Sequence, residues 1–214
     1  MSSPNIVYEA YPKVSVQEFI PELSFEFTDM PENAFAHFIL KAINNIARRG
    51  NVLRRTATIH TQDCVDNYRL EPQDCMDIVA VMGICKRDNC GCSPITRLTG
   101  QPCCLPCGSF SWFEKPNIIH ISDARCGNCY DVKFSVAPTY DACEVDEILL
   151  TQYYDLVMDG VRADLYGMGN KPWSSLQRLE YHKQQFDKGI RKAAIETLTG
   201  GQRGALKARR PRMF

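Results

Sequence analysis

The spacing of apolar residues changes twice along this chain, and these changes limit the folds that it can form. Apolar residues recur every three to four positions over 31–49, which predicts an amphipathic helix. Short β-rich segments separated by turn residues follow over 56–136. Helical spacing returns over 146–166 and again over 176–198, on either side of a breaker at 167–172. This order predicts an α+β fold in which a β-subdomain interrupts a small helical bundle.

The boundaries of these patterns divide the chain into parts. The bundle consists of one N-terminal helix and a C-terminal antiparallel helix pair, and the inserted β-subdomain is antiparallel and Cys-rich. Aromatic and proline residues at irregular spacing precede the first helix, which is typical of an extended segment. The parts are an extended docking arm at 1–30, the helical bundle at 31–55 and 139–200, the β-subdomain at 56–138 with its Cys-rich insertion at 85–129, and a basic tail at 201–214.

The composition supports a folded chain that stays out of the membrane. Hydrophobic residues make up 44% of the sequence, and 25 basic side chains balance 25 acidic ones. That is enough apolar material for a sizeable core. No apolar stretch is long enough to span a bilayer, and residues 1–5 lack the basic and apolar regions of a signal peptide, so we expect neither secretion by that route nor a membrane partner.

Eleven cysteines are the anomaly in the composition, and eight of them lie between 85 and 129. Two Cys-x-x-Cys pairs in this region are separated by eighteen residues, which is in the range of a four-cysteine zinc site. A hairpin between the pairs would bring both to the same open end. The sequence therefore predicts a structural zinc site, while free buried thiols and disulfides stay open as alternatives. The predicted ligands are Cys104, Cys107, Cys126 and Cys129.

Catalytic arrangements are unconvincing in this sequence. Both Cys pairs flank β-rich segments, so no helix N-terminus is available to stabilise the thiolate that a thiol oxidoreductase needs. The four histidines are scattered without a nucleophile motif, and there is no phosphate-binding Gly loop. We expect no enzymatic activity. A zinc-ribbon nucleic-acid-binding protein is the alternative, because basic and aromatic residues interleave around the cysteines at Lys86, Arg87, Arg97, Trp112, Phe113, Lys115 and Arg125.

Charge is unevenly spread although the total is zero. Residues 141–166 carry seven acids against the single base Arg162, whereas 201–214 carry five bases and no acid. Acidic helix and basic tail could pair between neighbouring copies, or both could simply be solvated. Exposed aromatic residues of the arm could anchor a partner. The candidate partner-binding residues are Tyr8, Tyr11, Phe19, Phe25, Arg203, Lys207, Arg209, Arg210 and Arg212.

Five groups of residues outside the insertion and the tail follow a pattern of helix boundaries and packing positions known from one family. They are Asp29-Met30-Pro31 through Arg48-Arg49; Tyr68-Arg69-Leu70-Glu71-Pro72; Ala137-Pro138-Thr139 with Val145-Asp146; Tyr153-Tyr154-Asp155 through Gly160-Val161-Arg162-Ala163; and Lys171-Pro172-Trp173-Ser174 with Phe186. In this pattern the chain resembles the bacteriophage head-to-tail adaptors, also known as connector, head completion or tail tubular proteins. The Cys-rich insertion departs from the family pattern.

The resemblance implies a structural virion protein. Such a protein forms a homo-oligomeric ring, commonly a dodecamer, in which the helical bundle makes the ring body. The implied partners are the portal protein, tail or nozzle proteins, and genomic DNA that passes through the lumen without sequence readout. The implied location is the head-tail junction of the virion, after assembly in the host cytoplasm.

Overall fold

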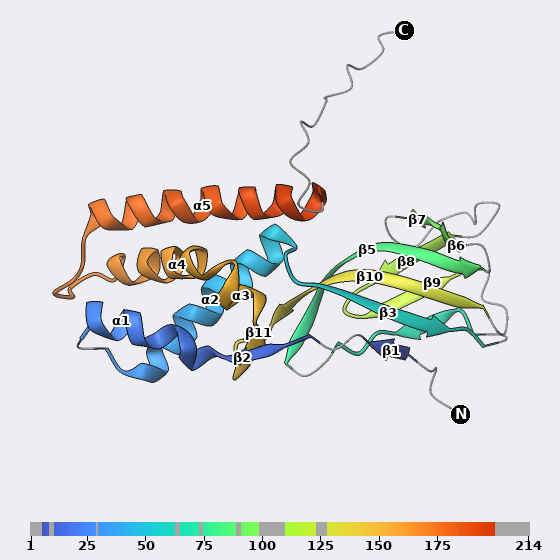
Figure 1. The fold of residues 1–214 in the computed structure, drawn as a ribbon, viewed down its shortest axis with the longest axis horizontal. Helices are drawn as coiled ribbons and strands as arrows, with labels where there is room; N and C mark the ends of the chain where they lie inside the picture. The colour runs from blue at the N-terminus through green and yellow to red at the C-terminus, as the bar shows by residue number, and fades with distance from the viewer. Residues whose placement is uncertain are drawn as a thin grey trace, which may run out of the picture.

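The structure is a computed structural model that describes residues 6–8, 11–28, 30–62, 65–72, 75–88, 91–98, 110–122 and 128–199. Helices gather at one end of an elongated molecule and most strands at the other (Figure 1). The predicted α+β class is confirmed. Among the helices in the described ranges, none has both the length and the apolarity to cross a bilayer.

The helical half is built around three long helices, which are α2 (Glu32–Gly50), α4 (Tyr154–Tyr166) and α5 (Leu176–Thr199). The predicted helices at 31–49 and 176–198 are confirmed by α2 and α5. Helices α4 and α5 run antiparallel across the breaker, and both pack on α2 (Figure 1). Gly160 of α4 permits this close approach, because an added Cβ there would lie 2.6 Å from Phe186 Cε2 and 2.9 Å from Ala42 Cβ.

The β half contains two larger sheets. One has five antiparallel strands in the order β1-β3-β10-β5-β6, and the other has four in the order β4-β9-β8-β7, with β7 and β8 parallel. The β-rich region predicted over 56–136 contains most of these strands, and the hairpin predicted between the two Cys-x-x-Cys pairs joins β8 to β9. The strands are β1 (Ile6–Tyr8), β3 (Arg54–His60), β4 (Asn67–Arg69), β5 (Met76–Asp88), β6 (Gly91–Pro94), β7 (Thr96–Leu98), β8 (Phe110–Glu114), β9 (Ile118–Ile121) and β10 (Cys129–Pro138).

The two halves share one hydrophobic core. The C-terminal end of β10 is buried against α2, where the Asn44 side-chain amide donates a hydrogen bond to the Pro138 carbonyl at 2.6 Å. The Val136 backbone N–H donates to the Leu53 carbonyl at 2.9 Å. An ion pair between Arg48 and Asp77 at 2.8 Å closes the same junction at the surface. These contacts fix the helical half on the sheet.

The N-terminal segment is not the extended arm that the sequence predicts. It forms β2 (Lys13–Ser15), a 3-10 turn η1 (Val16–Phe19) and helix α1 (Ile20–Glu26). The segment folds because Val16, Phe19, Ile20 and Leu23 are buried in the common core. The apolar residues of 16–23 have helical spacing, but Pro21 lies among them, at the start of α1, and obscured this signal.

The helix predicted over 146–166 is also interrupted. Glu144–Asp146 forms strand β11, which pairs with β2, and is followed by a short helix α3 (Ile148–Thr151) before α4 begins at Tyr154. Strand pairing here depends on β2, which lies some 130 residues earlier in the chain, so local periodicity could not reveal it.

Candidate functional site

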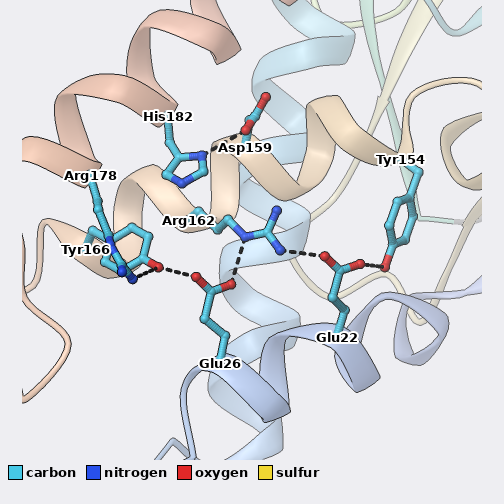
Figure 2. A network of polar contacts seen from close by, with 8 residues as sticks. All are labelled: Glu22, Glu26, Tyr154, Asp159, Arg162, Tyr166, Arg178 and His182. Atoms are coloured by element: carbon cyan, nitrogen blue, oxygen red, sulfur yellow. Dashed lines mark hydrogen bonds and ion pairs between the residues drawn. The ribbon is translucent and has the colours of Figure 1, made fainter.

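A polar network centred on Arg162 fastens the N-terminal helix to the bundle (Figure 2). Glu22 and Glu26 lie one turn apart on α1 and therefore face the same side of that helix. Arg162 of α4 lies between them, with Nη2 donating to Glu22 Oε1 at 2.5 Å and Nε to Glu26 Oε2 at 2.8 Å. The Tyr154 hydroxyl donates to Glu22 Oε2 at 2.8 Å.

The network continues from α4 into α5. The Tyr166 hydroxyl donates to Glu26 Oε1 and accepts a hydrogen bond from Arg178 Nη1 at 2.9 Å. The Tyr166 ring stacks on the ring of His182 with centroids 5.6 Å apart, and His182 Nδ1 lies 2.9 Å from Asp159 Oδ1. Helix α1, which is far from α4 and α5 in sequence, is thus joined to both by one network of polar contacts (Figure 2).

The environment shifts the pKa values of Glu22, Glu26, Tyr154 and Tyr166 away from neutral pH. The hydrogen bond from Tyr154, followed by that from Arg162, lowers the pKa of Glu22. Burial favours a higher pKa for Glu26, but the hydrogen bonds from Tyr166 and Arg162 outweigh it, and the pKa is lowered. Burial and Glu22 raise the pKa of Tyr154 to about 12.

These shifts describe a structural tie. A general acid or base works best when its pKa lies near the working pH, whereas here the carboxyl pKa values move down and the phenol pKa values of Tyr154 and Tyr166 move up. Each shift stabilises the ionised carboxylate or the neutral phenol that the hydrogen bonds require. The arrangement holds α1 in place.

A second tie lies where the two halves meet. Arg55 of β3 and Asp146 of β11 form a buried ion pair, with Nη2 at 2.6 and 2.7 Å from the two carboxylate oxygens. The Tyr11 ring covers the guanidinium, with its centroid 4.0 Å from Cζ. A cavity of about 460 Å³ opens beside the pair and is also lined by Arg54 and Ile148.

The predicted aromatic anchors have different environments. Phe19 is completely buried and stacks on Tyr154, so it belongs to the core of this chain rather than to a docking surface. Tyr11 is half-buried against Arg55. Tyr8 lies in β1, and its side chain is outside the described set. Phe25 is 86% exposed on α1 and stays a candidate partner-binding residue.

The predicted zinc ligands fall largely outside the described residues. Cys104, Cys107 and Cys126 are not described, nor is the basic tail with Arg203, Lys207, Arg209, Arg210 and Arg212. Cys129 begins β10, opposite His60 of β3, and its Sγ lies 3.2 Å from His60 Nδ1. Within the described ranges, no group of three or more potential ligands could hold a metal ion. The four-cysteine site and the zinc-ribbon alternative stay predictions.

Three of the seven acids between 141 and 166 are paired inside the molecule. Besides the pair made by Asp146, Asp159 contacts His182, and Asp164 forms an ion pair with Lys41 at 3.0 Å. The hypothesis that this whole acidic segment pairs with the basic tail of a neighbouring copy is therefore too broad, because three of its acids already have partners within the same chain. The contacts of Arg162 and Arg55 were not predicted from the sequence, although the i, i+4 spacing of Glu22 and Glu26 on one helix face was a visible signal.

The large hydrophobic side chains exposed among the described residues all lie in the helical half. One is on α1, one is in the turn that follows β10, and four are on α5. Helix α5 forms one edge of the molecule along its whole length (Figure 1). Exposed apolar groups gathered on one part of a surface are typical of protein interaction sites. They are Phe25, Tyr140, Leu176, Tyr181, Ile195 and Leu198.

No family model and no curated protein sequence matches this chain. Among solved structures it is similar to a chain of the neck of an empty GTA particle computed with C6 symmetry, with 16% sequence identity and a TM-score of 0.29. The alignment covers 85% of this chain and 95% of that chain. This is a weak similarity to a particle neck, and a TM-score this low establishes neither a shared fold nor a shared role.

Proposed function

We propose that this protein is a structural virion subunit, a head-to-tail adaptor whose copies form a ring between portal and tail, with DNA passing through the lumen. It does not act as an enzyme. The helical half makes the body of the ring, and the proposed partners are other copies of the chain, the portal protein and tail proteins.

The observation that carries this proposal is the confinement of exposed hydrophobic side chains to the helical half. Leu198 is 75% exposed and Leu176 is 71% exposed, on a helix whose opposite face is already packed on α2 and α4. Leaving such side chains in water forgoes the stabilisation that burial in an interface would provide. A subunit that is surrounded by other subunits in a ring would bury them.

The residues that carry the family resemblance support the same proposal. Trp173 packs edge-on against Phe27, with ring centroids 5.8 Å apart, and Phe186 fills the space that Gly160 leaves open. Pro138 lies at the junction of the two halves. These residues pack the helical half and join it to the sheet, which is the structural role proposed for a subunit of a particle.

Electron microscopy of the purified protein, alone and mixed with portal protein, tests this function. We expect rings with an open lumen in the protein alone, and end-on binding of these rings to portal. A protein that stays monomeric with and without portal, yet retards the migration of oligonucleotides, would instead favour the zinc-ribbon alternative.

A further inference from the structure

Helix α5 carries a continuous exposed stripe that the bundle does not use. Its residues follow one another at alternating steps of four and three, so they line one side of the helix. All of them are exposed. The centre of the stripe carries the cations Lys188 and Arg191, with the aromatic Tyr181 on the N-terminal side and the apolar Ile195 and Leu198 on the C-terminal side. We term this line the outer stripe, and it consists of Gln177, Tyr181, Gln184, Lys188, Arg191, Ile195 and Leu198.

A surface of opposite charge lies on the other side of the helical half. Residues 14–40 contain five acids and neither Lys nor Arg, and Arg162 of α4 pairs with two of these acids, Glu22 and Glu26. Glu18, Glu22 and Phe25 are exposed at steps of four and three along η1 and α1, with Pro21 exposed beside them. We term these four residues the acidic surface. Figure 1 shows α1 and α5 at opposite edges of the helical half, with α4 between them.

The charges decide which occupant can cover the outer stripe. The chain's own tail at 201–214 is basic, so it would be repelled by Lys188 and Arg191. Two outer stripes packed against each other in a two-fold dimer would also bring cations together. The acidic surface offers Glu18, which has no ion-pair partner among the described residues, and an exposed aromatic ring at Phe25.

We propose that the outer stripe of one copy docks on the acidic surface of the next copy. This inference rests on the proposed function and specifies how the ring is joined. Because the two surfaces differ and lie on opposite edges, each copy that joins leaves one surface of each kind free. Such a head-to-tail contact adds copies until the ring closes.

Charge-reversed variants test the contact. The double variant Lys188→Glu/Arg191→Glu makes the centre of the outer stripe negative. Glu18→Lys replaces the negative charge of the acidic surface at this position with a positive one. Each variant alone should assemble about tenfold more weakly than the wild type, because attractive contacts become repulsive. An equimolar mixture of the two variants should recover assembly, since each then presents a surface that complements the other. Lys133→Glu, at an exposed position of β10, is the matched control and should assemble normally.

Mass photometry at several salt concentrations reads out these assemblies, and far-UV circular dichroism confirms that the helices of each variant are intact. Wild-type rings should also dissociate more readily as salt increases. If the wild type forms rings and both charge-reversed variants assemble equally well, this contact is overturned while the proposed function stands. Variants that stay folded but do not recover in the mixture would overturn it as well. A wild type that never assembles would contradict the proposed function itself.

Discussion

The meeting point of α2, α4 and α5 gives a sharp prediction for Gly160→Ala. The added methyl group would lie 2.9 Å from Ala42 Cβ, which the α2 backbone fixes in place, and 2.6 Å from the buried ring of Phe186. Overpacking a core of this kind costs about 1–3 kcal/mol. Alanine in place of glycine inside a helix recovers about 1 kcal/mol. We therefore expect the free energy of unfolding to fall by about 1 kcal/mol.

Gly189→Ala is the matched comparison, because it makes the same chemical change in a neighbouring helix. Its methyl group would meet Leu156 Cδ1 at 2.4 Å, but this atom is the free end of a half-buried side chain that can rotate away. The helix-propensity gain should then dominate, leaving the protein unchanged or up to about 1 kcal/mol more stable. Urea denaturation followed by circular dichroism measures both variants. A Gly160→Ala protein as stable as Gly189→Ala would refute this account of the packing.

Three further predictions concern the ties and the cysteines. The lowered pKa values of Glu22 and Glu26 stabilise the fold above the ordinary carboxyl pKa, and this contribution to the free energy of unfolding is lost as the pH falls from about 5 to 3. Arg162→Leu should make the free energy of unfolding depend less on pH in denaturation curves measured across that range. Asp146→Ala leaves a buried guanidinium unpaired and should destabilise the fold by about 3–5 kcal/mol, whereas the double change with Arg55→Leu should recover part of the loss in thermal melts. Purified protein should contain one zinc ion per chain by elemental analysis and lose it in Cys129→Ser; protein without zinc would remove the four-cysteine hypothesis.

Much of the fold follows from periodicity. The 3.6-residue spacing over α2 and α5 and the alternation along β3 and the first half of β10 are strong because each of these stretches buries one face or stripe in the core. Helix α1 and strand β11 were missed for a different reason. Each owes its stability to partners distant in sequence, with α1 held by Arg162 and β11 by β2 and Arg55. Tertiary contacts overrode the weak local signal.

The candidate interaction surface was only partly visible in the sequence. An aromatic-rich segment near the N-terminus suggested an arm. The sequence pattern could not distinguish the buried Phe19 from the exposed Phe25. The exposed stripe on α5 could have been found, because Tyr181, Ile195 and Leu198 fall on the side opposite Phe186. The contacts of α5 with α4 were needed to decide which of these two sides of α5 faces the bundle.

Native mass spectrometry of the purified chain tests most directly whether this protein is built to assemble. The account predicts a closed species whose mass is one fixed multiple of the chain mass over a wide range of concentration. A single chain at every concentration, or a ladder of sizes without a preferred closed number, would contradict it.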